Sequence, residues 1–341
     1  MFIHSLMLRN FRRFTEQKFF FHPMTNIIIA PNSFGKTTVL EAIYLSLTGS
    51  GFRESKDEEF IKLGKEKARI QIILKEELTK EILQIEIGKK KEIFLNKNKS
   101  SFKEIYQKLP RPVLFTPQDI NILTGPPDER RRYLNNLLAN NDYKYKSLLL
   151  NYKQALKKRN KILQQAETSY QIKDEIKFWD KYLEKQDKEI FKYRKNFFIY
   201  ANDNNRFFDY EFRINYHQNR FKKLSDQPLK DQEVKYGYTL SGAHREYFTI
   251  QIKTHNGFLD VKRFGSRSEQ RIAMLWLKKL EANFLTNKYK PVLLIDDIFS
   301  ELDLKNRKMI IKFFSLYQTI LTTTSPLILQ LVDIPHHKIT L

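Results

Sequence analysis

The most constraining feature of the sequence is the eight-residue segment Ala-Pro-Asn-Ser-Phe-Gly-Lys-Thr at positions 30–37. An apolar run, Ile27 to Ile29, precedes it, and residues 37–47 after it have apolar side chains at helical spacing. A loop of this composition between a strand and a helix is a Walker A loop. Its backbone N–H groups and the positive end of the helix dipole bind phosphate groups. A chance Gly-Lys-Thr in a lysine-rich chain is the alternative, and the strand–loop–helix context argues against it.

The Walker A loop assigns roles to its residues. Lys36 is expected to reach the β- and γ-phosphates, and the Thr37 hydroxyl is expected to ligate Mg²⁺. Ala30 replaces the usual first Gly, which costs little unless that residue needs a positive φ. The expected ATP-binding residues are Ala30, Pro31, Asn32, Ser33, Phe34, Gly35, Lys36, Thr37 and Thr38.

A second motif lies far along the chain. Residues 292–295 are Val-Leu-Leu-Ile and are followed by Asp296 and Asp297, which is the Walker B pattern of a buried strand ending at a metal. Asp296 is expected to hold Mg²⁺, and Asp297 to orient or deprotonate the attacking water, so Asp297 and Lys36 are the candidate catalytic residues. A strand that ends in a helix cap is the alternative for this motif alone. The long separation of the two motifs excludes small GTPases and compact kinases.

The distribution of apolar residues, Pro and Gly along the chain predicts an α/β fold with an inserted helical arm. Residues 140–200 contain neither Pro nor Gly and repeat apolar side chains at three- and four-residue spacing, as in two long amphipathic helices. The predicted domains are 1–139, the first part of an α/β head; 140–209, the arm; and 210–341, the rest of the head. Strands are expected at 26–29, 70–74, 82–87, 112–115, 210–216, 248–252 and 291–295, and further helices at 37–47, 130–138 and 269–285.

Charge favours a polyanionic partner. Lys and Arg number 61 and Asp and Glu 39, a formal net charge of +22, which suits nucleic acid or an anionic membrane face. A general lysine bias is the alternative, but the short segment 140–225 holds 20 basic and 11 acidic residues, the densest surplus in the chain. With no Cys, disulfides, thiolate metal sites and Cys nucleophiles are excluded. No signal peptide or membrane-spanning run is recognisable, so a cytoplasmic protein that does not enter the membrane is expected.

Several segments carry a family resemblance. Residues 300–303, Ser-Glu-Leu-Asp, directly follow the second motif and resemble the D-loop of ABC-type ATPases, the group of the SMC and Rad-type repair proteins. The chain is also similar to the RecF family of bacterial recombination mediators over residues 2 to about 325. The segments that carry this resemblance are 6–12, 117–134, 242–246 and 294–303, with Thr322-Thr323-Thr324 after them.

The resemblance implies an ABC-type ATPase head that acts as a switch. ATP held between two copies would close a homodimer around DNA, and slow hydrolysis by a weak ATPase would reopen it. Ser266 and Asp303 would complete the partner's ATP site, and Thr37, Asp296 and Gln118 would hold Mg²⁺. The implied task is recombinational DNA repair and replication restart on gapped or duplex DNA, with single-stranded DNA as a further candidate. The implied partners are RecR and RecO, and indirectly RecA.

Departures from the family pattern concern the signature loop. Ser268 stands where Gly is usual and Glu269 where Gln is usual, and a carboxylate near a γ-phosphate would repel it. Gln118, Asn135 and Ala243 replace a usual Glu, Asp and Pro. Weaker or differently arranged ATP-driven dimerisation is therefore expected.

Other residues leave alternatives open. Arg130, Arg131 and Arg132 are candidate DNA contacts, but they could equally pair with Asp128 and Glu129 or pack inside the protein. The aromatic residues Tyr145, Tyr152 and Trp179 are expected in the core rather than stacked on bases. His336-His337 is expected to be a surface pair rather than a metal site. The alternative function is a related ATPase head that senses DNA ends or partners in a nuclease-associated or defence system.

Overall fold

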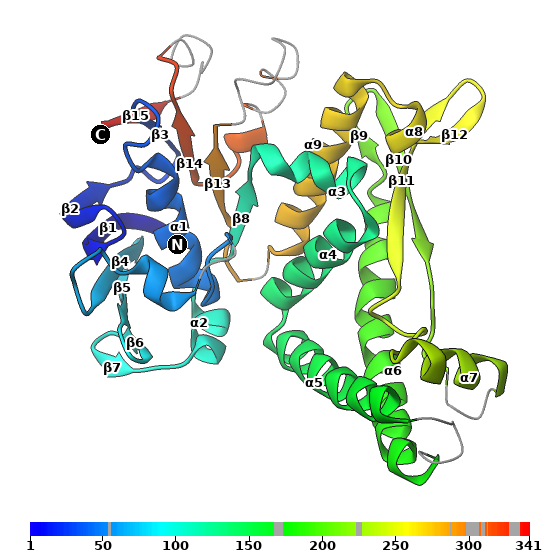
Figure 1. The fold of residues 1–341 in the computed structure, drawn as a ribbon. Coiled ribbons are helices and arrows are strands. Elements are labelled where there is room, and N and C mark those ends of the chain that lie inside the picture. The colour runs from blue at the N-terminus through cyan, green and yellow to red at the C-terminus, as the bar shows by residue number, and fades with distance from the viewer. Residues whose placement is uncertain are drawn as a thin grey trace. The chain divides into compact units, whose positions relative to one another are not determined.

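The structure is a computed structural model that describes residues 1–53, 56–166, 173–222, 227–286, 288–297, 307, 311, 313–326 and 335–341. The chain forms two compact units (Figure 1). The first unit combines Met1–Asp119 with Leu277–Leu341, and the second is Ile120–Trp276. Among the described residues, no helix has both the length and the apolar character needed to cross a membrane.

A parallel sheet in the first unit contains both nucleotide-binding motifs. Its strands, in spatial order, are β15 (His336–Thr340), β3 (Thr25–Ile29), β14 (Thr319–Thr323), β13 (Val292–Asp296) and β8 (Pro112–Phe115). All four neighbouring pairs are parallel, so the carboxyl ends of the strands meet at one edge. Every residue of β3 and β14 is buried, as expected for strands covered on both faces. Helix α1 (Lys36–Thr48) packs against β13, β8 and β14.

An antiparallel sheet forms the rest of the first unit. Its strands are β2 (Phe14–Phe20), β1 (Phe2–Phe11), β4 (Ala68–Glu76), β5 (Thr79–Ile87), β6 (Lys91–Leu95) and β7 (Asn98–Lys99), in that order. A 3-10 helix, Asp57–Phe60, and helix α2 (Phe102–Lys108) flank it. Inward side chains of β1, β4 and β5 join the buried face of α1 in one apolar cluster. The two sheets of this unit therefore share a core through α1.

The second unit combines long helices with a small antiparallel sheet. Its helices are α3 (Asn121–Thr124), α4 (Pro127–Asn141), α5 (Tyr143–Gln165), α6 (Lys173–Asp203), α7 (Gln227–Tyr236), α8 (Val261–Phe264) and the first part of α9 (Arg267–Phe284). Its strands, in spatial order, are β12 (Gly257–Asp260), β11 (Tyr247–Thr254), β10 (Tyr210–His217) and β9 (Arg206–Phe207). Helices α5 and α6 run side by side (Figure 1). They are the two amphipathic helices that the sequence predicts.

The boundaries of the units differ from the predicted domain boundaries. The second unit begins at Ile120 and ends at Trp276, whereas the predicted arm covers residues 140–209 alone. The physical reason is that the aromatic side chains on one face of α6 must be buried from water, and the strands that follow α6 bury them. The Phe198 ring lies 4.5 Å from the Tyr216 ring and 5.6 Å from the Phe248 ring, centroid to centroid, so the sheet closes the core of the helices.

The predicted core aromatics of the helices fall into two groups. Tyr145 and Tyr152 are buried, at 0% and 2% exposure, as the sequence predicts. Trp179 is only half-buried, and the Lys158 ammonium lies 5.0 Å from its ring centroid. Trp179 is thus packed less deeply than the two tyrosines, and its expected place in the core stays a prediction.

Candidate nucleotide-binding site

The loop between β3 and α1 requires glycine at its last position. Gly35 has φ 98°, in the left-handed region, and it caps the N-terminus of α1. A Cβ atom there would lie 2.7 Å from Cζ of Phe14 and 2.9 Å from Cδ of Arg13. Both the backbone conformation and the close approach of Arg13 and Phe14 therefore make any side chain at this position strained. Ala30 has no positive φ, so its Cβ is accommodated without strain.

Lys36 lies inside the loop. The residue is 6% exposed, and its Nζ donates hydrogen bonds to the carbonyls of Ala30, at 2.7 Å, and Pro31, at 2.9 Å. Within the described residues, no side chain caps the N-terminus of α1. Its first N–H groups and the ammonium group therefore form a cationic cradle of the kind that binds phosphate.

The two distant motifs meet at a cluster of oxygen atoms. The Thr37 hydroxyl lies 3.0 Å from each carboxylate oxygen of Asp296, and the Thr322 hydroxyl donates to Asp296 Oδ1 at 2.8 Å. Thr322 belongs to β14, which lies between the strands of the two motifs. Carboxylate and hydroxyl oxygens are the hard ligands that Mg²⁺ prefers, so this set of donors fits the ion. Spacing along the sequence assigns Thr322 no role at the site, because only the strand order places it beside Asp296.

Asp297 follows the end of β13 directly. Its backbone has φ 47°, and its N–H donates to the carbonyl of Thr322 at 3.1 Å. A non-glycine residue in the left-handed region is uncommon, and this conformation redirects the chain at the edge of the sheet where Asp296 lies. The backbone of Asp297 therefore lies directly beside the oxygen cluster around Asp296.

Gln118 also lies at this edge. It is exposed in the 3-10 helix Pro117–Ile120, which follows β8, and β8 pairs with β13. The neighbouring Asp119 anchors the segment, because it accepts a hydrogen bond from the Thr116 N–H at 2.8 Å and lies 3.5 Å from Lys278 Nζ. Burial raises the pKa of Asp119. Asp303, the other predicted contact to a partner's nucleotide, lies outside the described residues.

The β1–β2 turn braces the loop in two ways that the sequence did not reveal. Arg12 Nε lies 2.7 Å from Glu41 Oε2, and the Glu41 side chain on α1 is 0% exposed. The Arg13 guanidinium lies 5.4 Å from the ring centroid of Phe34 at the tip of the loop. In the sequence, Glu41 stands out only as a charged residue among apolar residues of the predicted helix, which does not reveal its pairing with Arg12.

The signature loop forms a reciprocal cap on helix α9. The Ser266 hydroxyl accepts a hydrogen bond from the Glu269 N–H at 3.2 Å, and Glu269 Oε2 accepts one from the Ser266 N–H at 2.7 Å. This is a capping box, which the Ser-x-x-Glu spacing encodes but which was not among the expectations for this loop. Ser266 and Ser268 are exposed. Glu269 therefore has a structural role in addition to the electrostatic one expected from its charge.

The three candidate DNA-binding arginines have different surroundings. Arg130 is 6% exposed, and its guanidinium donates to the carbonyls of Leu123, at 3.1 Å, and Gly125, at 3.3 Å. Arg131 pairs with Asp128, and Arg132 pairs with Glu129. The geometry corresponds to the alternative of local pairing and packing, while a DNA contact by Arg131 or Arg132 stays a prediction.

The histidines near the C-terminus lie on strand β15. His336 and His337 are both exposed there. Within the part of the chain that the structure describes, no group of three His, Asp or Glu side chains is arranged to hold a metal ion.

Comparisons with known proteins agree with this architecture. The RecF/RecN/SMC N terminal domain family matches residues 2–333. The DNA replication and repair protein RecF of Alkaliphilus oremlandii is 30% identical, covering 95% of this chain and 93% of its own. That of Lachnospira eligens is 31% identical, with the same coverage. A solved structure of the recombination mediator protein RecF with ATP, in the RecFOR pathway, has TM-score 0.81 and 29% identity, covering 99% of this chain and 95% of its own. An Smc head has TM-score 0.55 at 15% identity over 98% of this chain and 92% of its own, a likeness of fold alone.

Proposed function

The chain belongs to the RecF family, and from this premise we propose that it is an ATP-dependent DNA-binding protein of recombinational DNA repair and replication restart. The observation that carries the proposal is the contact of Thr37 with Asp296, at 3.0 Å. It joins the Walker A and Walker B motifs at the carboxyl edge of one parallel sheet, where P-loop proteins bind nucleotides. Relatives named for DNA replication and repair support the cellular role.

The proposed nucleotide is ATP with Mg²⁺. The backbone of residues 30–38 and the Lys36 ammonium would hold the phosphates, and Thr37, Asp296 and Gln118 would hold the metal. Bound Mg²⁺ would neutralise charge on the phosphate oxygens. Asp297 would orient the attacking water and accept its proton, which makes the chain a weak ATPase. A solved RecF structure described with ATP supports the choice of nucleotide.

Hydrolysis is proposed to serve as a conformational switch. Two copies would hold ATP between them, with Ser266 and Asp303 completing the partner's site. The exposed Ser266 at the N-terminus of α9 is accessible for such a contact. The capping box keeps the Glu269 carboxylate at this terminus, so closure requires it to move from the approaching phosphates or share the N–H groups with them.

DNA is the proposed macromolecular partner. The net charge of +22 favours a polyanion, and phosphate contacts would make binding weaken steeply with salt. Gapped DNA is the proposed substrate, and RecR and RecO, and indirectly RecA, are the proposed partners. The solved structure described as part of the RecFOR pathway supports these partners. The relatives compared are DNA replication and repair proteins, which disfavours the alternative of a nuclease-associated or defence sensor.

The test compares Lys36→Ala with the natural chain in filter binding to gapped, duplex and single-stranded DNA, with and without ATP. Loss of the Lys36 ammonium removes the charge that holds the phosphates, so ATP-dependent dimerisation and DNA retention should disappear. The matched control is Lys80→Ala, which removes an equal charge from an exposed position on β5. DNA retention that is identical with and without ATP in the natural chain would refute the switch.

A further inference from the structure

Two tyrosines at the end of α7 are stacked on each other at the surface of the second unit. Tyr236 is 54% exposed and Tyr238 is 40% exposed. Their ring centroids are 5.8 Å apart, with 26° between the ring planes. Exposed rings that already lie nearly parallel offer a π-face to a further planar group at little entropic cost.

The guanidinium of Arg245 extends this stack. It lies 5.3 Å from the ring centroid of Tyr238, and the residue is exposed. One of its nitrogens is also 3.5 Å from the carbonyl oxygen of Thr239, which limits the orientations it can adopt. A planar cation beside stacked rings suits aromatic bases and the phosphates that join them.

Helix α5 supplies positive charge next to the stack. Gly237, between the two tyrosines, has φ 71°, and a Cβ there would lie 3.0 Å from Cγ of Gln164, so the chain runs close along α5. Lys157 and Lys161 are exposed and lie on the same helical strip as Gln164, at i, i+4 and i+7. The sequence of α5 contains no Asp or Glu. A polyanion on the tyrosines therefore meets an uninterrupted cationic helix.

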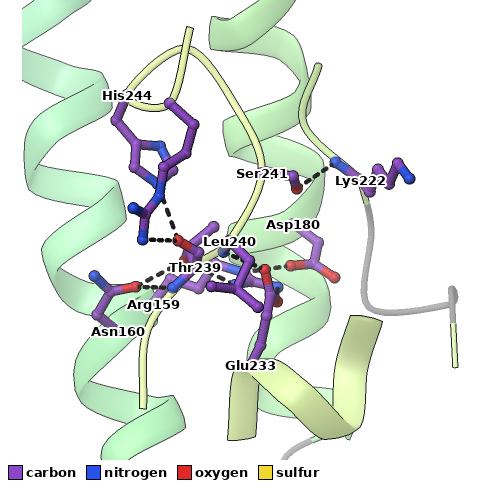
Figure 2. A network of polar contacts seen from close by, with 10 residues as sticks. Arg159, Asn160, Asp180, Lys222, Glu233, Thr239, Leu240, Ser241 and His244 are labelled. Carbon is purple, nitrogen blue, oxygen red and sulfur yellow. Dashed lines mark hydrogen bonds and ion pairs between the residues drawn. The ribbon is translucent and has the colours of Figure 1, made fainter. Parts of the chain in front are cut away.

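Buried ion pairs hold the segment after Tyr238 in place (Figure 2). Arg159, with 0% side-chain exposure, lies 2.8 Å from Asp180 and 2.8 Å from Glu233, and it donates to the Thr239 hydroxyl at 2.8 Å. Glu233 in turn accepts from the Leu240 N–H at 2.7 Å. Buried charges satisfied in this way fix a geometry more than they add stability.

A second set of contacts fixes the side of the segment nearer Arg245. His244 Nε2 lies 3.0 Å from the Thr239 carbonyl and must donate to it, so Nδ1 accepts from the Tyr152 hydroxyl at 2.9 Å. The Asn160 side-chain oxygen accepts from the Thr239 N–H at 3.0 Å. Figure 2 shows Thr239 between Asn160 and His244. The outward-facing tyrosines and Arg245 thus extend from a rigid, buried base.

We propose that Tyr236, Tyr238 and Arg245 form a stacking platform for the bases of single-stranded DNA, with Lys157 and Lys161 contacting its phosphates. The inference deepens the proposed function, since it rests on DNA being the partner, and it assigns the unpaired strand a place of its own on the second unit. Bases within a duplex are stacked on each other and cannot use such a platform, whereas unpaired bases can.

The test measures binding of a short labelled oligo(dT) to the full chain by fluorescence anisotropy, without ATP and at fixed salt. Tyr238→Ala and Tyr236→Ala should each raise the Kd about tenfold, the usual effect of removing one base–aromatic stack. Tyr238→Phe should bind like the natural chain, because stacking needs the ring and not the hydroxyl. An abasic oligonucleotide of the same length should bind the natural chain at least as weakly as oligo(dT) binds Tyr238→Ala, because it cannot stack on either ring. Lys157→Gln should reduce the slope of log Kd against log salt by about 0.7.

The matched control is Phe20→Ala in the first unit, which also removes an exposed ring with a cation over it, Lys18 at 4.7 Å. It should leave oligo(dT) binding unchanged, and blunt duplex should bind Tyr238→Ala as it binds the natural chain. Unchanged oligo(dT) binding by Tyr238→Ala, an equal loss for blunt duplex, or no binding of oligo(dT) by the natural chain would each overturn the platform. If tyrosine-dependent oligo(dT) binding persists while ATP has no effect on gapped DNA, the ATP switch fails and the platform stands.

Discussion

Replacement of Arg159 by methionine should destabilise the second unit by about 4 kcal/mol. The side chain is 0% exposed and lies 2.8 Å from both Asp180 and Glu233, whose side chains are 8% and 1% exposed. Removing Arg159 takes away the buried cation that pairs with both of these carboxylates. Breaking one buried pair in this way typically costs about 3–5 kcal/mol. Methionine fills most of the volume, so the loss is electrostatic and not the result of a cavity.

Tryptophan fluorescence isolates this unit experimentally. The chain has two tryptophans, Trp179 and Trp276, and both belong to the second unit. Trp276 is buried, and its indole N–H donates to the carbonyl of Asn204 at 2.9 Å, so its emission changes when the unit unfolds. Urea unfolding followed by fluorescence therefore gives the free energy of this unit even if the whole chain does not unfold in one step.

The controls separate buried charge from general damage. Lys192→Met on α6 removes an exposed ammonium that pairs with Glu189, and it should leave the unfolding midpoint unchanged. Adding Asp180→Asn and Glu233→Gln to Arg159→Met should restore a large part of the lost stability, because the buried charges are then neutral. A loss below about 1 kcal/mol, the level of a surface pair, or no recovery in the triple variant, would refute the reasoning.

Two further predictions concern Asp297 and His244. Asp297→Asn should slow ATP hydrolysis at least tenfold while retaining ATP binding, since Asn tolerates the left-handed backbone at φ 47° but cannot accept the proton; an unaltered turnover rate would remove Asp297 from the reaction. Burial lowers the pKa of His244 to about 4. Below about pH 6.5 the imidazole is therefore protonated in the unfolded chain but stays neutral in the folded chain. The contribution of His244 to the free energy of unfolding is thus fully present above about pH 6.5 and is lost as the pH falls toward 4. Between pH 7.5 and pH 5 the second unit should lose about 2 kcal/mol in fluorescence-monitored unfolding, and His244→Gln should lose measurably less; equal losses would contradict the assignment.

The parts of the site that lie in short continuous segments were predictable from the sequence. A loop between a strand and a helix identified Lys36 and Thr37, and an apolar run ending in two acids identified Asp296 and Asp297. The predicted strand 112–115 coincides with β8, and the predicted pair of arm helices corresponds to α5 and α6. The capping box of Ser266 and Glu269 is also encoded locally, although only the charge of Glu269 entered the expectation for this loop.

The rest depends on packing between distant residues. Thr322 reaches Asp296 because β14 lies between β3 and β13, and no periodicity along the chain specifies strand order. The Arg159 ion pairs join residues from three helices, and the division of the chain at residues 119 and 276 follows from the core that the helices share with their sheet.

The sequence by itself determined many of the helices and strands, the phosphate-binding loop and the acidic strand end, because helix and strand periodicity and loop chemistry act over a few residues. The tertiary structure alone decided which side chains from separate elements meet, from the oxygen cluster around Asp296 to the stacked pair Tyr236 and Tyr238. Contacts of this kind depend on how whole helices and strands pack against each other, and the sequence of a single segment does not specify that packing.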